Sequence, residues 1–233
     1  MNIAIIPARG GSKRIHKKNI KIFHGRPIIS YSIKAAKESK LFEKIICSTD
    51  DEEIAKIASK YGAECPFLRS SELSDDHSST TDVINHTIDY FTKQKKEYKL
   101  ICCIYPAAPF INRTKIIEGY NKIKNEDWGY VFSASKSPVS IFRAFEKKSN
   151  NSIQMLNPDY FFKRTQDLSS TYFDAGQFYW GKKESWINKI NIFDKYSTIV
   201  EIPYYESIDI DTIEDWKAAE LFYEKKYQDE KNT

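Results

Sequence analysis

Residues 2–19, "NIAIIPARGGSKRIHKKN", join a short uncharged run to a basic loop that contains two adjacent glycines. The run 2–6 is mostly apolar, as is typical of a buried strand in an α/β sheet. The loop after it carries five Lys or Arg residues, and no Asp or Glu precedes Glu38. A strand that leads into an acid-free glycine loop predicts an anion-binding loop at the carboxyl edge of a sheet.

The residue types in this loop favour a phosphate-bearing ligand. Gly10 and Gly11 lack side chains that would hold an anion away from the backbone N–H groups, and Ser12 adds a hydroxyl donor. The cationic side chains that we expect to contribute are Arg9, Lys13 and Lys18. Neither the Walker pattern nor G-x-G-x-x-G is present. A solvated basic loop and a nucleic-acid patch are the alternatives.

Outward from this loop, apolar runs alternate with segments of helical period. The expected strands are 2–6, 44–49, 100–105, 130–135, 198–202 and 207–210, with a short one at 65–68. The expected helices are 27–40, 50–63, 78–94, 113–126, 183–190 and 212–226. Buried strands separated by helices predict an α/β fold with a mainly parallel sheet and helices on both faces, in a single domain spanning 1–233.

The alternation breaks between the expected strand at 130–135 and the aromatic run 172–180. Residues 137–171 contain turn signals at 149–151 and 157–158 and have no helical period. This segment is therefore expected to be an inserted flap, which serves oligomerisation or covers a site.

The segment 207–212, "SIDIDT", is the second candidate for chemistry. In an extended segment, Asp209 and Asp211 lie on one face and alternate with isoleucines on the other. Two neighbouring carboxylates suit a hard cation such as Mg²⁺, especially one shared with ligand phosphates. The alternative is a helix start, because Thr212 followed by Asp215 has the spacing of a capping box. Both interpretations can hold together.

Composition limits the class of protein. The 233 residues carry a net charge of +4, with a basic beginning and ten acids against four lysines from Glu201 onward. The four cysteines form no C-x-x-C pair, and no apolar run is long enough for a membrane span. We expect a cytoplasmic protein with reduced thiols. No nucleophile elbow and no histidine metal spacing occur.

Residues 7–19 resemble the A-R-x-x-S-K-x-x-x-x-K-N signature of the cytidylyltransferases that activate nonulosonic, or sialic-type, acids with CTP. The blocks "IICSTDDEEIA" (45–55), "RSSELSDD" (69–76) and "SIDIDT" fall in the expected order, so the resemblance spans nearly the whole chain. It implies a Rossmann-like nucleotidyltransferase fold. It also implies transfer of CMP from CTP to the anomeric hydroxyl of the sugar acid, with release of pyrophosphate.

Two further blocks, "CCIYPAAPF" (102–110) and "YFDAGQFYWG" (172–181), resemble the branch that acts on pseudaminic acid. Sialic-acid enzymes typically carry Q-P-T-S-P-L-R where this chain has "YPAAPFI" at 105–111. The difference removes a glutamine and an arginine from a sugar-facing loop, which favours a less hydrophilic, deoxygenated sugar. The alternative substrates are legionaminic and N-acetylneuraminic acid.

The resemblance assigns a role to each matching residue. The expected nucleotide-binding residues are Ala8, Arg9, Gly10, Gly11, Ser12, Lys13, Lys18, Asn19, Arg69 and Ser79. The expected sugar-binding residues are Tyr105, Asp174 and Gln177, together with Arg143 and Arg164 from a partner subunit. Asp209 and Asp211 are expected to hold Mg²⁺, and the catalytic residues are expected to be Lys13, Arg9 and Asp211.

The resemblance also implies a homodimer whose flap reaches the partner's active site, and a place in flagellin glycosylation or surface polysaccharide synthesis. The alternative of another class is a non-catalytic RNA-binding protein that uses the basic N-terminal third. The paired carboxylates disfavour this alternative because they would repel a nucleic-acid backbone, and no membrane partner is expected.

Overall fold

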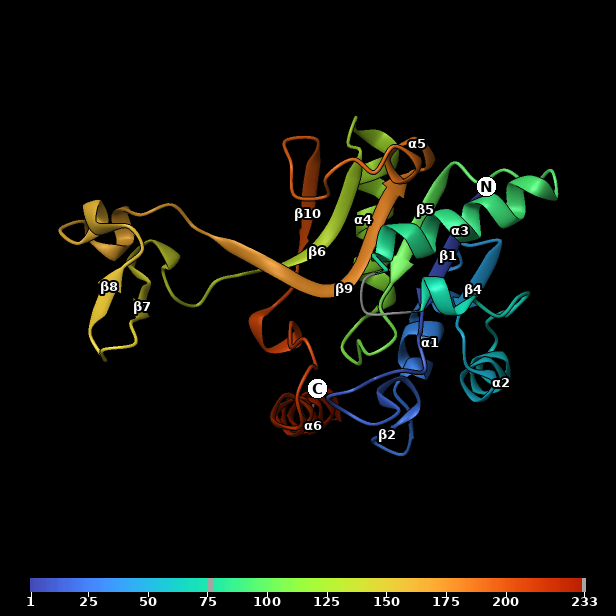
Figure 1. Ribbon diagram of the computed structural model, residues 1–233, viewed down its shortest axis with the longest axis horizontal. Coiled ribbons are helices and arrows are strands. Elements are labelled where there is room, and N and C mark those ends of the chain that lie inside the picture. Colours follow the sequence, from blue (N-terminus) through green and yellow to red (C-terminus); the bar gives the residue numbers. More distant parts are fainter. Residues whose placement is uncertain (75–77, 232–233) are drawn as a thin grey trace.

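The computed structural model describes residues 1–74 and 78–231 and is built on a six-stranded sheet (Figure 1). The strand order is β10-β6-β9-β5-β1-β4, and every neighbouring pair is parallel except those of β9. The strands are β1 (Asn2–Pro7), β4 (Lys44–Ser48), β5 (Leu100–Ile104), β6 (Tyr130–Lys136), β9 (Tyr172–Lys182) and β10 (Ser197–Glu201). The expected mainly parallel sheet is confirmed.

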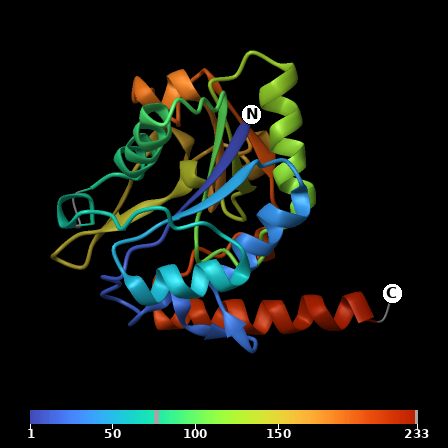
Figure 2. The ribbon, with the colours of Figure 1, turned by 90° about the vertical axis from the view of Figure 1, so that its right-hand side faces the viewer.

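Helices cover both faces of this sheet, as Figure 2 shows. One face packs against α1 (Ile29–Ser39), α2 (Glu52–Tyr61) and α4 (Arg113–Asn125). The other face packs against α3 (Thr80–Lys93) and α5 (Lys183–Ile187). The two buried clusters alternate along each strand, because successive side chains of a strand point to opposite faces. Ile46, for example, belongs to one cluster and Cys47 to the other.

Side chains at the helix starts explain why the helices begin where the sequence predicts. Asp51 caps α2 by accepting hydrogen bonds from the backbone N–H groups of Glu53 and Ile54. Asn112 caps α4 in the same way. The predicted capping box of α6 (Ile213–Lys231) is confirmed, since the Thr212 hydroxyl donates to Asp215 over 2.8 Å and accepts from its N–H over 3.2 Å.

A third buried cluster joins the two ends of the chain. It packs α6 against the small hairpin of β2 (Ile22–Phe23) and β3 (Arg26–Pro27). The rings of Phe23 and Trp216 meet edge to face, with centroids 5.5 Å apart. The C-terminal helix therefore lies beside the residues that follow the glycine loop, below the sheet in Figures 1 and 2.

The carboxyl ends of β1, β4 and β5 meet at one edge of the sheet. Pro7 pairs with Ser48 at the ends of β1 and β4, and β5 ends at Ile104 on the other side of β1. The connections that leave this edge are the glycine loop, the segment that caps α2 and the segment after β5. Because β9 runs antiparallel to its neighbours, its first half reaches the same edge.

Residues 137–171 form an arm between β6 and β9, and Figure 1 shows it projecting away from the sheet. The arm carries the short antiparallel pair β7 (Phe145–Lys147) and β8 (Ile153–Met155). The chain returns from it into the sheet as the neighbour of β6, which explains the antiparallel direction of β9. Short 3-10 helices lie at Lys18–Ile20, Ser71–Leu73, Ile141–Arg143, Pro158–Tyr160, Thr165–Asp167 and Tyr204–Glu206.

Two strand predictions were wrong. Residues 207–210 are irregular, because this segment leaves the sheet edge and is bound by the glycine loop through the Ile210 carbonyl group. Residues 65–68 form no strand, because only Leu68 pairs there, in an isolated bridge with Thr49, and the bridge of Glu64 with Ile46 precedes the segment. The last residues of the block 69–76 lie outside the described part of the chain. Among the helices that the structure describes, none has both the length and the apolarity to cross a bilayer.

Candidate active site

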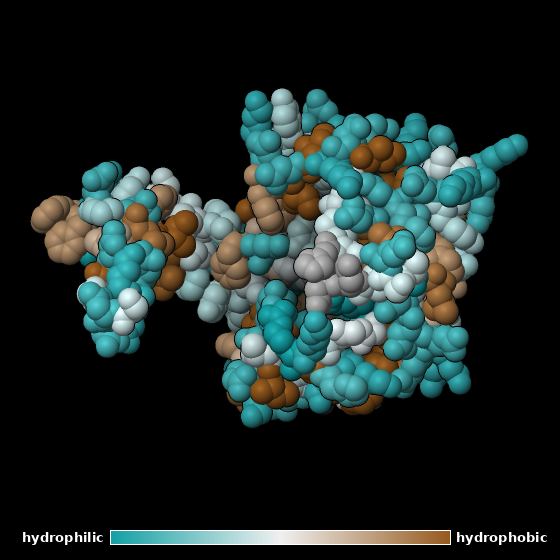
Figure 3. All heavy atoms as spheres, viewed as in Figure 1, coloured by the Kyte–Doolittle hydropathy of each residue, from teal (hydrophilic) through white to brown (hydrophobic). Residues whose placement is uncertain are grey.

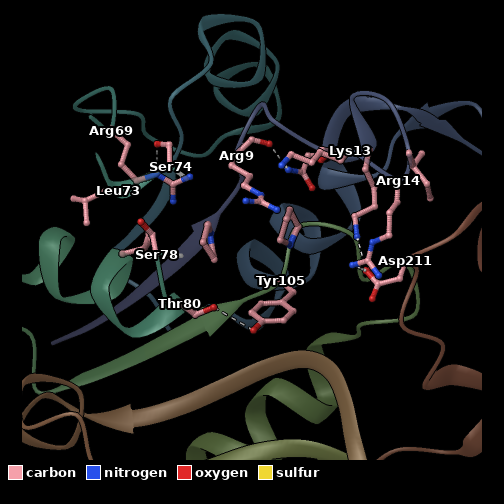
Figure 4. Close-up of a pocket in the computed structure, with 17 residues that line it drawn as sticks. Arg9, Lys13, Arg14, Arg69, Leu73, Ser74, Ser78, Thr80, Tyr105 and Asp211 are labelled. Atoms are coloured by element: carbon pink, nitrogen blue, oxygen red, sulfur yellow. Dashed lines mark hydrogen bonds and ion pairs between the residues drawn. The ribbon is translucent and has the colours of Figure 1, made fainter. Parts of the chain in front are cut away.

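A cleft of about 320 Å³ opens at the carboxyl edge of the sheet. Figure 4 shows Arg69, Ser74 and Ser78 on one side of it and Arg14 and Asp211 on the other. Its remaining lining residues are Pro7, Arg9, Ser12, Lys13, Ile15, Lys18, Asn19, Leu73, Thr80, Val83, Tyr105 and Pro106. The volume lies within the usual range for small-molecule sites.

Buried hydrogen bonds give the glycine loop its shape. Asn19, which is only 4% exposed, donates from Nδ2 to the carbonyl oxygen of Arg9 over 2.9 Å. The N–H of Gly10 donates to Asp50 Oδ1 over 2.9 Å. A Cβ atom on Gly10 would lie 2.8 Å from Asp51 Oδ2, whereas one on Gly11 would meet nothing within 4 Å. Gly10 is therefore required where the loop touches the cap of α2.

The C-terminal acidic segment closes one end of the cleft. Lys18 Nζ donates to the carbonyl oxygen of Ile210 over 2.6 Å and lies 3.4 Å from Asp211 Oδ1. Arg14 Nη2 lies 2.8 Å from the same carboxylate oxygen. The basic beginning and the acidic end of the chain thus meet at the cleft. Their positions far apart in the sequence do not by themselves require this contact.

Arg69 lies at the opposite end of the cleft. Its residue is only 6% exposed, and burial lowers the pKa of its guanidinium although the group stays charged. Nε donates to Ser74 Oγ over 3.2 Å, and Nη2 lies 3.8 Å from Asp50 Oδ1. Because Asp50 also accepts from the N–H of Gly10, one carboxylate links this arginine to the glycine loop.

Tyrosine hydroxyls connect the cleft to β9. Tyr105 Oη lies 3.3 Å from Thr80 Oγ1, and desolvation raises the pKa of Tyr105 to about 12. The Tyr105 ring lies next to that of Tyr179, with centroids 5.2 Å apart. The Tyr179 hydroxyl donates to Asp174, and burial raises the pKa of Tyr179. Both phenols are therefore neutral hydrogen-bonding groups at physiological pH.

Asp209 and Asp211 form a candidate site for a divalent cation. Partial desolvation and the nearby carboxylate of Asp211 raise the pKa of Asp209, so the folded protein holds the charged form of Asp209 at a cost. No cluster of three or more His, Cys, Asp or Glu residues with metal-binding geometry occurs in residues 1–74 and 78–231. Mg²⁺ usually takes one or two protein carboxylates and completes its shell with phosphate oxygens and water. The donor set fits Mg²⁺ on those terms.

A glycine in the first half of β9 has its backbone in the left-handed region and lies close to Asp209. Gly176 has φ +59°, and a Cβ atom there would lie 3.6 Å from Asp209 Cγ. The backbone N–H of Gly176 donates to Asp174 Oδ1 over 3.0 Å. The irregularity in β9, between the pairs Phe132–Tyr179 and Ala134–Asp174, therefore places a third carboxylate near the candidate cation site.

Most of the predicted residues meet at the cleft, and some do not. Those that line it are Arg9, Ser12, Lys13, Lys18, Asn19, Arg69, Tyr105 and Asp211. Ala8 is fully buried below the loop, and the Ser79 hydroxyl is engaged in the capping box of α3 with Asp82. Gln177 is 3% exposed and donates to the Glu206 carbonyl oxygen over 2.7 Å. Arg143 and Arg164 lie on the arm, outside this chain's own cleft.

Sequence reasoning missed several residues of the cleft. Arg14 stands among the basic residues of the loop, but nothing in its position distinguishes it from its neighbours. Ser74 belongs to the quoted block 69–76 and Ser78 follows that block, but the resemblance assigned a role to neither of them. Thr80 begins α3 and could have been found only as a polar residue just after an N-cap.

The chain matches the family model described as cytidylyltransferase over residues 3–228. It is 40% identical to the pseudaminic acid cytidylyltransferase of Campylobacter jejuni, over 97% of this chain and 98% of that protein. It is 32% identical to the CMP-N,N'-diacetyllegionaminic acid synthase of Legionella pneumophila, over 95% and 96% of the two chains.

Solved structures confirm the fold. CMP:2-keto-3-deoxy-manno-octonic acid synthetase, solved in complex with CTP, superimposes with a TM-score of 0.71. The match covers 97% of this chain and 99% of the other at 14% sequence identity. The predicted Rossmann-like nucleotidyltransferase fold is therefore confirmed.

Proposed function

The chain belongs to the cytidylyltransferase family, and we propose that it transfers CMP from CTP to the anomeric hydroxyl of pseudaminic acid, releasing pyrophosphate. The higher identity to a pseudaminic acid enzyme than to a legionaminic acid enzyme supports this substrate. Membership of this enzyme family removes the reason for the RNA-binding alternative. One observation carries the assignment: the basic glycine loop and the carboxylate of Asp211 line the same cleft.

The loop residues would hold the triphosphate of CTP. Arg9, Lys13 and Lys18 line the cleft together, and their charges would offset the charge that grows on the departing pyrophosphate. Ser12 adds a hydroxyl donor, and Asn19 keeps the loop in shape through the Arg9 carbonyl group. Arg69, at the other end of the cleft, would face the cytosine or the ribose. Positioning and charge neutralisation supply most of the rate in such transfers.

Asp209 and Asp211 would hold Mg²⁺ beside the phosphates. When bound, this ion would neutralise phosphate charge and lower the pKa of the attacking hydroxyl. Asp211 is ion-paired to Arg14 and Lys18, which would hold its carboxylate oriented toward the loop. Asp211 is also the candidate general base for the anomeric hydroxyl.

The sugar acid would lie between the segment after β5 and the irregular part of β9. Tyr105 and Asp174 offer a hydroxyl and a carboxylate there, and the latter is held by the Tyr179 hydroxyl and the Gly176 N–H. Pro106, which follows Tyr105 in the lining of the cleft, offers an apolar ring and no hydrogen-bond donor. A deoxygenated sugar suits such a wall better than one that needs a hydrogen-bonding partner at each carbon.

Incubation with CTP, Mg²⁺ and one sugar acid at a time tests this proposal. Pyrophosphate release, together with the CMP-sugar detected by mass spectrometry, should give the highest kcat/KM with pseudaminic acid. Legionaminic and N-acetylneuraminic acid serve as matched controls for substrate choice. A higher kcat/KM with either control would identify that sugar acid as the substrate instead. The absence of pyrophosphate with all three sugar acids would contradict the proposed activity.

The arm supports a homodimer as part of the same proposal. It exposes a set of apolar side chains that a lone subunit would leave in water (Figure 3). These are Val139, Ile141, Phe145, Ile153, Leu156, Phe161 and Phe162, the last of them 91% exposed. Arg143 and Arg164 lie among them on the arm, so dimerisation could deliver either arginine to the carboxylate of the partner's sugar.

Sedimentation equilibrium of two phenylalanine variants tests the dimer. Phe162→Asp should shift the protein toward monomer, because it places a charge in the apolar surface of the arm. Phe193→Asp is the matched control, since Phe193 is an exposed phenylalanine (63%) that lies outside the arm. A monomeric wild type, or an equal effect of both variants, would contradict dimerisation through the arm.

A further inference from the structure

Two cysteines outside the cleft lie opposite each other on two adjacent segments of the chain. Cys47 lies in β4, and Cys65 follows the end of α2. The bridge between Ile46 and Glu64 is parallel, so the next residues along, Cys47 and Cys65, face each other in register. The Cys47 N–H donates to the Glu64 carbonyl oxygen over 2.9 Å, which fixes this register.

The two side chains lie on the same face of the sheet. Cys47 belongs to the cluster under α2, and Cys65 packs against that cluster, while Ile46 belongs to the cluster on the opposite face. Adjacent strands lie about 4.7–4.9 Å apart, within the range of Cα separations that a disulfide accepts. The sulfur of Cys65 also lies 3.5 Å from the Ala55 carbonyl oxygen of α2.

The other two cysteines have no such geometry. Cys102 and Cys103 are fully buried neighbours in β5, so their side chains point to opposite faces of the sheet. Burial raises the pKa of both thiols. Cys102 shares a face with Cys47, but β1 lies between β5 and β4 and keeps the two apart.

We propose that Cys47 and Cys65 form a redox modification site, in which a peroxide converts the two thiols into a disulfide. Cys65 is the half-buried member, and Cys47 is wholly buried behind it. The oxidant therefore reaches Cys65 first, and Cys47 is the resolving thiol. The disulfide would tie β4 to the base of the segment that leads to Arg69, one end of the cleft.

The charge state of the pair agrees with these roles. A hydrogen bond from the Cys47 thiol lowers the pKa of Cys65 to about 7, so a large fraction of Cys65 is thiolate near neutral pH. Hydrogen bonding to Cys65 and burial raise the pKa of Cys47 well above its usual value. The nucleophile is thus the more accessible sulfur.

The oxidation proceeds in two balanced steps. The Cys65 thiolate attacks one peroxide oxygen, so that the S–O bond forms and the O–O bond breaks. The hydroxide that leaves combines with the proton that the Cys65 thiol had released, and forms water. The Cys47 sulfur then attacks the sulfenic sulfur of Cys65; the S–S bond forms, the S–O bond breaks, and the departing hydroxide leaves as water with the proton of Cys47. The two thiols lose two electrons, and the peroxide gains them.

Thiol counting after treatment with hydrogen peroxide tests the proposal. The reduced full-length protein is exposed to the oxidant, denatured and alkylated, and its intact mass is measured. The wild type should fall from four alkylated cysteines to two and lose the mass of two hydrogens, and dithiothreitol should restore all four. Peptide mapping should join Cys47 to Cys65, while Cys102 and Cys103 stay alkylated as internal controls.

Cys65→Ser separates disulfide formation from general oxidation. In this variant the three remaining cysteines should all alkylate after the same treatment, because the attacking thiol is missing. The proposal is overturned if wild-type Cys65 gains oxygen while Cys47 still alkylates, if the link joins two chains, or if all four thiols survive. Each result is read from the wild type, so it does not depend on the folding of the variant.

Discussion

Replacing Lys18 with methionine tests the contact that joins the two ends of the chain. Lys18 Nζ donates to the Ile210 carbonyl oxygen over 2.6 Å and lies 3.4 Å from Asp211. Methionine keeps the apolar stem and removes the donors and the charge. The substitution would break the contact between Lys18 and Ile210, which are 192 positions apart in the sequence. No contact between residues close in the chain replaces it.

The magnitude follows from the exposure of the groups. A hydrogen bond from a charged donor contributes about 1.5–3 kcal/mol to the free energy of unfolding. The ion pair adds only about 0.2–1 kcal/mol, because the side chains of Lys18 and Asp211 are 22% and 37% exposed and solvent screens them. We expect a total loss of about 2–4 kcal/mol, which lowers the Tm of a chain this long by about 4–16 °C.

Thermal unfolding followed by circular dichroism, without nucleotide or metal, measures this structural part. The functional part is measured as kcat/KM for CTP, which should fall about 30- to 1000-fold when a preorganised phosphate donor is lost. Lys17→Met is the matched control, since Lys17 pairs with Glu53 at the exposed surface, where solvent screens the pair, and its loss should leave the Tm close to that of the wild type. A Tm for Lys18→Met no lower than that of the control would show that the Lys18 contact does not stabilise the fold.

Three further changes test other parts of the cleft. Lys13→Ala should raise the activation free energy by about 2–4 kcal/mol, and near-normal CMP-sugar formation would contradict its phosphate role. Gly10→Ala should cost about 1–3 kcal/mol of stability in chemical denaturation, because its Cβ would lie 2.8 Å from an oxygen of Asp51. Gly11→Ala, with open space at that position, should not share the steric cost. Asp209→Asn should raise the Tm of the metal-free protein at neutral pH and less at acidic pH, while abolishing Mg²⁺-dependent turnover. The sign follows from the raised pKa of Asp209: its ionised form disfavours the folded state above that pKa, and the cost vanishes once the carboxyl is protonated in both states. An equal Tm gain at both pH values would contradict this reasoning.

Local patterns in the sequence predicted most of the fold because each depends on residues that are close in the chain. The alternation of buried runs and helical periods indicated the parallel sheet. The start of α2 at Asp51 and the start of α6 at Thr212 followed from hydrogen-bonding side chains within one helical turn. The glycine loop was predictable for the same reason, since its strand, glycines and charges are contiguous.

Strand predictions failed where the sequence carried the right pattern but the sheet offered no place for it. The alternation in 207–210 is that of a strand, yet this segment binds Lys18 instead of pairing at the sheet edge. The aromatic run 172–180 takes a place inside the sheet as part of β9, between β5 and β6. Pairing partners depend on the order of strands, and that order is a property of the whole chain.

Contiguous residues fix the chemistry available: an acid-free glycine loop, a pair of aspartates, and the residues that match a cytidylyltransferase signature. The folded chain decides which of these groups meet. It brought Lys18 to Asp211, joined Arg69 to the glycine loop through Asp50, and sent the Gln177 amide to a backbone carbonyl group. The physical reason is distance. Spacing along the chain encodes contacts within a turn or a strand, whereas contacts between the two ends of the chain arise only when the sheet and its helices have closed around a common core.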